Sequence, residues 1–498
     1  MNVNPITRLD YPDPDVIRVE DTYYMVSTTM HFMPGCEILQ SFDLVHWEHA
    51  TYVYETLDHT DAQQLKSGQN IYGQGMWAAS LRYHEGRFYI CFVANDTRKT
   101  YLYTSEKIDG PWKKQLIEGF YHDGSLLFDE DGRNYIVYGN DEIWITELNE
   151  DLTAPKKGGL HRLLVSDHKN PELGYEGSHI QKINGYYYIF LVHSLRDRWM
   201  RTEACFYSDS LEGEFTGGDV LCDDRGYCGQ GVAQGGIVDT PDGKWYAMLF
   251  QDSGAVGRIP ILLPVTWKDH FPIFGQNGHV PEEIEVHSTR PGYIYQPLVG
   301  SDDFCNGLLP RWQFNHDPDP RYYHLDALQG TYTITTREVC TELTQAVNTL
   351  TQRMSYPSCA AEVTVDASAL KEGDVAGLCA LQSCYAAVGI TKHHGKYEVL
   401  MLDKKEDGIL DMTEGTVVES HQMDFRLEAD FCNMKDEARC YYRVNKGDWL
   451  PIGTVHKLYF KLDHFTGCRF GLFCYAAEET GGSACFRDFK YYDVDEIS

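Results

Sequence analysis

Five short hydrophobic runs in the first three hundred residues share one pattern: a turn with Asp or Gly, a tyrosine soon after it, and then apolar residues. The copies are DTYYMVS (21–27), GRFYICF (86–92), GRNYIVY (132–138), GYYYIFL (185–191) and GKWYAML (243–249). An earlier apolar stretch precedes each copy across a tight turn, as in SLLFDEDGRNYIVY. Each unit is therefore predicted to be a β-hairpin.

The tyrosines of these hairpins recur at intervals of about 46 to 65 residues, which is the length of a four-stranded propeller blade with its loops. They are Tyr24, Tyr89, Tyr135, Tyr188 and Tyr246. Five copies predict a five-bladed β-propeller over residues 1–297. Unrelated hairpins in one large β-sandwich are the alternative, but the repeated register of turn and tyrosine favours the propeller.

The remainder of the chain has a different organisation. The segment 275–300 carries three prolines and little periodicity, which indicates a linker or a wrapping arm. Short alternating runs follow, among them GTYTITT, CAAEVTVD and YEVLMLD, and they predict an antiparallel, jelly-roll-like β-sandwich over residues 298–498. Because no helical period is sustained anywhere, we expect an all-β protein.

Composition and charge narrow the classes of function. Aromatic residues make up 13% of the chain, with 34 tyrosines, which suits pleated surfaces and sugar-facing pockets. The 43 basic and 74 acidic side chains leave a formal charge of −31, which repels a nucleic-acid backbone and an anionic membrane. We therefore expect neither a nucleic-acid partner nor a membrane partner.

The cysteines and the N-terminus bear on the compartment. The 15 cysteines show no C-x-x-C pairing, so they are read as reduced and mostly buried rather than as a metal site. The first residues, MNVNPITRLDYPDPD, contain neither a basic region nor an apolar run typical of a secretory signal. These features predict a cytoplasmic location.

Three carboxylates occupy the same structural place in different hairpin units. Asp13 precedes VIRV, Asp123 precedes SLLF, and Glu176 precedes the strand HIQKI. The innermost strands of a propeller line its channel, so residues just before them should converge at one mouth. Three acids in one pocket cannot all keep their solution pKa values, because burial and like charges raise the pKa of one of them. A protonated acid then lies beside an ionised one. Hydrolysis of a glycoside by two carboxylates needs such a donor and acceptor.

The sequence around these acids resembles glycoside hydrolase family 43, the β-xylosidases and α-L-arabinofuranosidases. The stretches that carry the resemblance are 4–47, with LDYPDPDVIRV, GMWAASLRYHEGRFYI (75–90), HDGSLLFDEDGR (122–133) and EGSHIQKINGYYYI (176–189). DFCNGLLPRWQFNHDPDP (303–320) and NTLTQR (348–353) resemble the concanavalin-like C-terminal domain that accompanies the exo-acting β-xylosidases.

The resemblance implies an inverting hydrolysis and a role for each acid. Asp13 falls on the general base that activates water, and Glu176 falls on the general acid that protonates the leaving oxygen. Asp123 falls on the residue that raises the pKa of the acid and orients it. Inversion needs the base and the acid roughly 6.5–9.5 Å apart, so that water fits between the sugar and the base.

Four further residues are expected to bind substrate. Trp77 and Phe32 could each offer an apolar face on which a pentose stacks. Arg258 matches a family arginine at the pocket floor, where a fixed guanidinium would bond sugar hydroxyls and hold an acid in place. His179, three residues after Glu176, is grouped with them as a hydrogen-bonding partner.

The neighbours of Asp13 are expected to be structural. Asp10 and Asp15 are interpreted as turn formers or strand caps. Pro12 and Pro14 restrict the backbone on both sides of Asp13, and Pro14 favours an extended conformation for Asp13 itself. The base is thus expected on a stiff support.

One departure from the family concerns metal ions. Many members carry a histidine on the inner strand of the fifth blade that holds calcium through waters, whereas this chain has Gln234 there, which puts a central ion in doubt. Asp303 and Asp488, near the ends of the sandwich, could instead share a structural calcium ion. The reaction itself requires no cofactor.

The function predicted from the sequence is an exo-acting, inverting glycosidase that releases a terminal pentose from an oligosaccharide, either D-xylose or L-arabinofuranose. A fructan hydrolase has the same architecture, but its Asn-Asp-Pro-Asn-Gly motif is absent here. A non-catalytic, carbohydrate-binding propeller is the other alternative, and the intact set of three acids argues against it. The choice of pentose and the oligomeric state, a homo-oligomer included, stay open.

Overall fold

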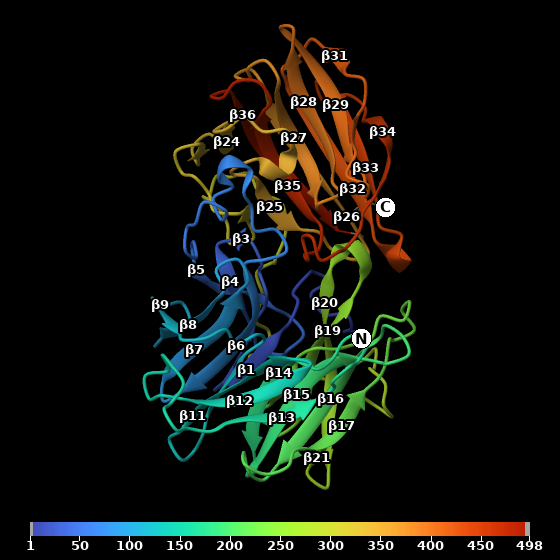
Figure 1. Ribbon diagram of the computed structural model, residues 1–498. Coiled ribbons are helices and arrows are strands. Elements are labelled where there is room, and N and C mark those ends of the chain that lie inside the picture. The colour runs from blue at the N-terminus through green and yellow to red at the C-terminus, as the bar shows by residue number, and fades with distance from the viewer. Residues whose placement is uncertain (1–2, 494–498) are drawn as a thin grey trace.

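The protein is built almost entirely of strands in two regions, as the computed structural model of residues 3–493 shows (Figure 1). The helical elements in these residues are four 3₁₀ turns: Lys66–Gly68, Gly254–Val256, Leu343–Gln345 and Cys432–Met434. None of them is long enough to cross a membrane. The expected all-β class is confirmed.

The N-terminal region is a propeller of five four-stranded antiparallel sheets. The first blade comprises β1 (Asp15–Val19), β2 (Thr22–Val26), β4 (Gly35–Ser41) and β5 (Glu48–Tyr54). The second comprises β6 (Met76–His84), β7 (Arg87–Ala94), β8 (Lys99–Ser105) and β9 (Lys113–Ile117). The third comprises β10 (Ser125–Phe128), β11 (Asn134–Asn140), β12 (Glu142–Leu148) and β13 (His161–Ser166). The fourth comprises β14 (Glu176–Ile183), β15 (Tyr186–Ser194), β16 (Arg201–Ser208) and β17 (Thr216–Leu221). The fifth comprises β18 (Gly236–Asp239), β19 (Trp245–Asp252), β20 (Arg258–Lys268) and β21 (Phe271–Phe274).

The repeated hairpins join the first and second strands of each blade, and the repeated tyrosine lies on the second strand. Two of the turns show why glycine stands there. Glu85 and Gly86 have φ values of 48° and 78°, and Asn184 and Gly185 have values of 50° and 85°. Positive φ at both central residues defines a type I′ turn, whose twist suits a two-residue hairpin.

The C-terminal region is a sandwich of two antiparallel sheets packed around one apolar core. The larger sheet contains β3 (Phe32–Met33), β22 (Gln313–Asn315), β25 (Leu350–Arg353), β35 (Arg469–Ala476), β27 (Asp374–Leu381), β28 (Ala386–His393), β29 (Lys396–Lys404), β30 (Leu410–Met412) and β31 (Thr416–Val418). The smaller contains β23 (Tyr323–Asp326), β24 (Thr331–Thr335), β36 (Ser483–Asp493), β26 (Ser358–Asp366), β32 (Gln422–Asp430), β33 (Glu437–Val444) and β34 (Leu450–Lys457).

The two regions share a sheet rather than meeting only through a linker. Strand β3 leaves the first blade and pairs with β22, with Met33 opposite Phe314. The described chain has no strand between Phe274 and Gln313, the stretch that contains the predicted boundary at 297/298. That boundary stays a prediction. Because β3 pairs with β22, a short segment of the N-terminal region is itself part of the sandwich sheet.

The sandwich lies over one end of the propeller (Figure 1). Buried Asp10 holds this contact, because its two carboxylate oxygens each accept a backbone N–H at 2.8 Å, one from Arg258 and one from Gly467. Arg353 also reaches from the sandwich to Glu37, at 2.9 Å. A sandwich loop near Gly467 is thereby held against the mouth of the propeller.

Candidate active site

The three predicted acids lie at the same end of three inner strands. Asp13 comes two residues before β1, Asp123 two residues before β10, and Glu176 is the first residue of β14. His122 joins two of them, since its Nε2 lies 3.6 Å from Oδ2 of Asp123 and 3.5 Å from Oε2 of Glu176. The charge of Asp13 also acts on Asp123 and His122. The structure therefore brings the three acids into one cluster.

Two side chains orient the buried carboxylate of Asp13. Thr28 donates its hydroxyl to Oδ2 at 2.6 Å, and Arg258 donates from a guanidinium nitrogen to Oδ1 at 3.1 Å. Arg258 is itself buried, so this cation faces the carboxylate away from bulk water. The two contacts fix the position of both carboxylate oxygens.

The backbone at Asp13 differs from the sequence expectation. Its φ is 52°, in the left-handed region rather than the extended one that Pro14 favours. The carbonyl of Pro12 accepts hydrogen bonds from the Ser27 hydroxyl at 2.6 Å and from the Thr28 N–H at 3.2 Å. These contacts, together with those to the carboxylate, outweigh the local preference and hold Asp13 in a strained conformation.

Asp123 is buried and faces the start of the strand that carries Glu176. Its φ is also positive, at 48°, and its Oδ2 accepts the N–H of Gly177 at 3.0 Å. Burial, together with the nearby charges of Glu176 and Asp13, raises the pKa of Asp123 to about 6, against the opposing effect of His122. A proton therefore binds to this cluster more readily than to an aspartate in water.

His122 is a member of the cluster that the sequence interpretation missed. The charge of Asp123, aided by a hydrogen bond to Glu176, raises the pKa of His122 to about 9. An imidazolium at neutral pH therefore lies between two of the acids. The sequence signal was its position directly before Asp123 in YHDGS, but a single histidine beside an acid is common in loops.

Glu176 faces the cleft and has one amide partner. Nδ2 of Asn140 donates to its Oε2 at 2.7 Å, from the end of the third blade's second strand. About a fifth of its side chain, 19%, is exposed, so a ligand in the cleft can reach the carboxyl. Asn140 was also missed, because nothing in GNDEI marks it as a neighbour of the acid.

A cleft of about 640 Å³ opens at Glu176, and both regions of the protein form its walls. The propeller contributes Trp77, Glu176, Trp199, Arg201 and Asp252, and the sandwich contributes Met434, Asp436, Phe460, Leu462 and Phe465, among others. Arg201 pairs with Asp252 at 2.9 Å on the propeller side. An apolar cleft with a few charged groups is the usual form of a site for a small ligand.

Phe465 of the sandwich completes the site beside two predicted binding residues. Its ring centroid lies 5.4 Å from that of Trp77 and 4.2 Å from the guanidinium carbon of Arg258. Arg258 also donates to the backbone carbonyl of Phe465 at 3.3 Å. The structure thus places Trp77 in the cleft wall and Arg258 against Asp13, as expected, and adds an aromatic residue that lies some 450 positions from Asp13 in the sequence.

His179 does not reach the cleft, which corrects its assignment as a substrate-binding residue. It is buried below the acids, and its Nδ1 lies 3.0 Å from Oδ1 of Asp15. The other oxygen of Asp15 accepts from Arg82 at 2.8 Å and from the Leu81 N–H at 2.7 Å. Burial alone would raise the pKa of Asp15, but Arg82 and His179 more than offset it and hold that pKa below its usual value. Asp15 and His179 are thus a buried support.

Phe32 is also wrongly assigned as a binding residue. It is 2% exposed and packs in a sandwich cluster with Leu343 and Val375. The guanidinium carbon of Arg469 lies 3.5 Å from its ring centroid. Its strand, β3, turns away from the channel to join the sandwich sheet, and this pairing could not be seen in the sequence of HFMPG.

The calcium prediction gains no support from the donor groups. Asp303 and Asp488 face one shallow hollow together with Asp302, but calcium takes six to eight oxygen ligands. In residues 3–493, the group of three His, Cys, Asp or Glu ligand atoms within 4.8 Å of one another is His122, Asp123 and Glu176. The described residues near Asp303 do not form a comparable group.

Comparisons with known proteins agree with this architecture. The sequence profile described as Glycosyl hydrolases family 43 matches residues 3–272, and that of the Beta xylosidase C-terminal Concanavalin A-like domain matches residues 301–492. A Beta-xylosidase of Formosa agariphila is 26% identical over 554 residues, covering 99% of this chain and 89% of that protein.

Two solved structures are also similar. A bifunctional GH43-CE protein of Bacteroides eggerthii has a TM-score of 0.92 and 42% identity, and the match covers 99% of this chain. This chain spans only 64% of that longer one. An engineered GH43 glycoside hydrolase, described as having endo-xylanase and exo-arabinofuranosidase activity, has a TM-score of 0.86 and 26% identity, with 99% and 100% of the two chains covered.

Proposed function

The chain belongs to glycosyl hydrolases family 43 and is a glycoside hydrolase, and we propose that it releases a terminal pentose from short oligosaccharides with inversion at the anomeric carbon. The observation that carries the proposal is the convergence of Asp13, Asp123 and Glu176 at one mouth of the propeller, under a cleft with aromatic walls. Two carboxylates on opposite sides of a sugar are what this hydrolysis needs.

Asp13 is proposed as the general base. Arg258 and Thr28 hold its carboxylate in place, so it can accept a proton from a water molecule without first reorganising. As the water attacks the anomeric carbon, its proton passes to Asp13, and the new C–O bond forms on the face opposite the leaving group. Fixing this carboxylate lowers the entropic cost of aligning the water.

Glu176 is proposed as the general acid. It protonates the glycosidic oxygen while the bond from that oxygen to the anomeric carbon breaks, so the aglycone leaves as a neutral alcohol. Asn140 orients the carboxyl, and Asp123 bonds the backbone of the next residue, Gly177. We propose that Asp123 acts through this contact and through its charge, as the residue that positions and tunes the acid.

D-Xylose from β-1,4-xylo-oligosaccharides is the first substrate we propose, and L-arabinofuranose from arabinoxylan fragments is the second. The relative from Formosa agariphila is called a Beta-xylosidase, whereas the engineered relative is described as an exo-arabinofuranosidase as well. The two sugars present similar hydroxyls to a pocket lined by Trp77, Phe465 and Arg201. The sandwich residues in the cleft wall support exo action, because a second wall opposite the propeller limits how far a chain can extend through the cleft.

Activity on 4-nitrophenyl β-D-xyloside and 4-nitrophenyl α-L-arabinofuranoside tests the roles of the acids. We expect Asp13→Ala to lower kcat by roughly a thousandfold or more, because general-base assistance is lost. Glu176→Ala should be less damaging on these substrates, since 4-nitrophenolate leaves with little help, and far more damaging on xylobiose. Asp21→Ala, at an exposed ion pair with Arg290, is the matched control.

The stereochemistry of the product tests the mechanism. In an NMR time course, the first sugar released from a β-xyloside should be the α-anomer, which then mutarotates. A β-anomer at early times would favour a retaining mechanism such as that of the fructan hydrolases. Equal activity of wild type, Asp13→Ala and Glu176→Ala would instead favour a binding propeller without catalysis.

We also propose that the enzyme works in the cytoplasm on short oligosaccharides after their import. All 15 cysteines are unpaired, which suits a reducing compartment. Fractionation of cells that express the natural gene, followed by detection of the protein, tests this location. Recovery outside the cytoplasm would contradict it.

A further inference from the structure

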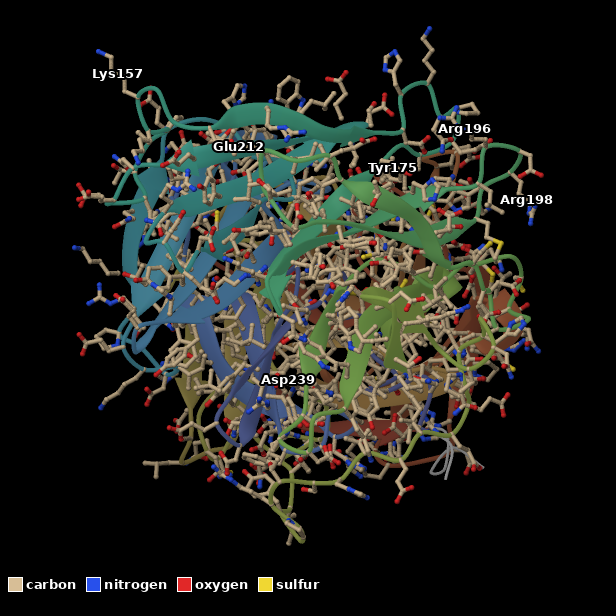
Figure 2. The ribbon with its side chains drawn as sticks, turned by 90° about the horizontal axis from the view of Figure 1, so that it is seen from below. Lys157, Tyr175, Arg196, Arg198, Glu212 and Asp239 are labelled. Atoms are coloured by element: carbon tan, nitrogen blue, oxygen red, sulfur yellow. The ribbon has the colours of Figure 1, made fainter. Side chains whose placement is uncertain are left out.

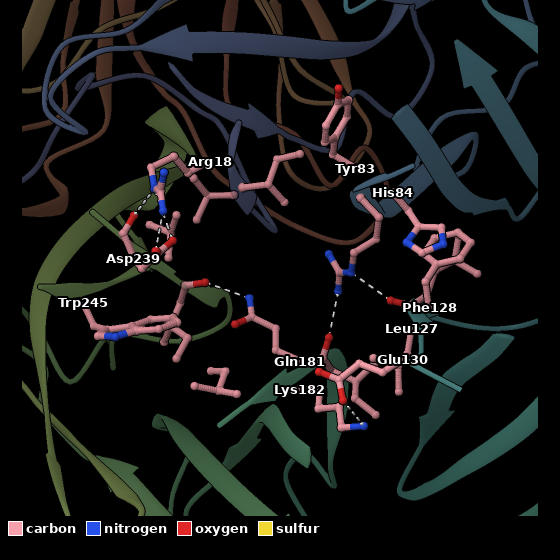
Figure 3. A pocket seen from close by; sticks show the side chains of 18 residues that line it. Arg18, Tyr83, His84, Leu127, Phe128, Glu130, Gln181, Lys182, Asp239 and Trp245 are labelled. Carbon is pink, nitrogen blue, oxygen red and sulfur yellow. Dashed lines mark hydrogen bonds and ion pairs between the residues drawn. The ribbon is translucent and has the colours of Figure 1, made fainter. Parts of the chain in front are cut away.

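A second hollow opens at the opposite end of the propeller channel, away from the acids. The later residues of all five inner strands, β1, β6, β10, β14 and β18, line it, and its volume is about 450 Å³. Figure 2 looks toward this end of the molecule, where Asp239 is labelled, and Figure 3 shows the hollow at close range. Its volume lies within the range of roughly 300–1,000 Å³ that is usual for pockets that bind small molecules.

Arg82 separates this hollow from the catalytic mouth. Its guanidinium donates to Asp15 at 2.8 Å, to the carbonyl of Leu126 at 2.8 Å and to the hydroxyl of Ser125 at 2.6 Å. It also reaches the carbonyl of Ile180 at 3.2 Å. Arg82 lies on β6 and therefore connects this strand to β1, β10 and β14 across the channel. The hollow is thus a separate compartment and not the lower end of the catalytic cleft.

The charges around the hollow are already balanced. Arg18 pairs with Asp239 at 2.5 Å, and Lys182 pairs with Asp129 at 2.6 Å. Arg82 is neutralised by Asp15. Each cation therefore has a carboxylate within contact distance, so an anionic ligand would find no unbalanced positive charge. A neutral ligand fits this environment better.

Hydrogen-bonding groups also line the hollow. Each inner strand is the edge strand of its blade, so the peptide groups on its channel side have no strand partner, and side chains already bond some of them, the carbonyls of Leu126, Ile180 and Ile237 among them. Gln181 spans two blades by donating from Nε2 to the carbonyl of Ile237 at 2.8 Å, with its other amide atom turned to the space between them (Figure 3). Peptide groups and an amide of this kind match the hydroxyls of a sugar.

Aromatic rings stand on two sides of the same hollow. Trp245 lies on one side, and on the other His84 stacks on Phe128 with centroids 4.6 Å apart (Figure 3). Tyr83 also lines the hollow, with its ring turned away from that pair (Figure 3). Tyr83 is 43% exposed, so a ligand in the hollow can reach its ring. Flat apolar faces beside hydrogen-bonding groups suit the C–H and O–H faces of a sugar ring.

We propose that this hollow is a second, non-catalytic binding site for a neutral monosaccharide or for the terminal unit of a short oligosaccharide. It does not rest on the roles assigned to Asp13 and Glu176, because it uses other residues in another compartment. The same sugar could therefore bind at both ends of the channel. It would be cleaved from its oligosaccharide at the catalytic mouth and only held at the other end.

Titration with D-xylose and L-arabinose, followed by calorimetry and ligand-observed NMR, tests the proposal. Wild type should show two classes of site. Tyr83→Ala and Gln181→Leu should each weaken one class by about tenfold, since a stacking face or a hydrogen-bonding amide is lost. Their kcat/KM on 4-nitrophenyl β-D-xyloside should stay within twofold of wild type.

Trp144→Ala is the matched control, because Trp144 stacks on His161 away from both hollows and should leave both classes intact. Trp77→Ala should weaken the other class and lower kcat/KM. A single class of site in wild type, or two classes that neither Tyr83→Ala nor Gln181→Leu changes, would overturn the proposal. Displacement of the sugar by inorganic phosphate would also overturn it, since each cation around the hollow is already paired with a carboxylate.

Discussion

Nδ1 of His179 lies 3.0 Å from Oδ1 of Asp15, beneath the mouth of the propeller. Asp15 follows Asp13 by two residues on the first blade, and His179 follows Glu176 by three on the fourth. This buried contact therefore joins the strand that carries the proposed base to the strand that carries the proposed acid. The distance between the carboxylates of Asp13 and Glu176 therefore depends on Asp15 and His179, which do not line the cleft.

Replacing Asp15 should cost both stability and turnover. In Asp15→Asn, Arg82 loses its carboxylate while only 12% of its side chain is exposed, and breaking a buried pair costs about 3 kcal/mol. Thermal unfolding should show a lower Tm, and kcat should fall more than KM changes. Asp21→Asn breaks the exposed pair with Arg290 and should change neither. Similar behaviour of the two variants would contradict a positioning role for Asp15.

His122 should set the pH range of activity. Burial raises the pKa of Asp123, and the His122 imidazolium opposes this effect, so His122→Asn should raise the pKa of Asp123 further. If ionisation of Asp123 limits kcat/KM, the limb of the pH profile that follows it should then move to higher pH, by roughly half to one unit. A profile that keeps its position, or moves to lower pH, would show that the imidazolium does not act on the catalytic groups.

The same histidine should make stability depend on pH. The pKa of His122 is raised in the folded state from 6.5 to about 9, chiefly by Asp123. Its contribution to the free energy of unfolding is therefore fully present below pH 6.5, and it is lost as the pH rises toward 9. Between pH 6.5 and pH 9, the free energy of unfolding of wild type should fall by up to about 3 kcal/mol more than that of His122→Asn. Chemical denaturation of both proteins at the two pH values measures this difference. An NMR titration of the ring protons checks the pKa directly.

Phe465 should decide how well the terminal sugar is held. Phe465→Ala removes a ring that contacts Trp77 and Arg258 at the cleft, which is expected to raise KM about tenfold. Phe465→Leu, which keeps part of the bulk, should recover some of the loss. This substitution is a sharper test of the sandwich than deletion of residues 300–498, because deletion would also remove the partner strand of β3 and expose the propeller face that it covers. An unchanged KM in Phe465→Ala would exclude the sandwich wall from substrate binding.

Local patterns in the sequence were enough to identify the blades and the acids. A turn followed by a tyrosine and an apolar run depends only on neighbouring residues, and five copies at blade-length spacing leave few architectures open. Asp13, Asp123 and Glu176 could be found because each stands just before an inner strand, and the closure of a propeller brings such positions together. Trp77 and Arg258 were predicted from their motifs, and the structure places Trp77 in the cleft wall and Arg258 beside Asp13.

The other parts of the site were decided by contacts between segments far apart in the chain. Phe465 enters the cleft only because a sandwich loop is held by Asp10, and Phe32 leaves it because β3 pairs with a sandwich strand. His179 points to Asp15 rather than to the cleft because a buried carboxylate next to Arg82 is the better partner. The sequence by itself determined the repeating unit and the placement of the acids along it. Only the tertiary structure decided which side chains surround them, because packing and burial join residues whose separation in the chain carries no local signal.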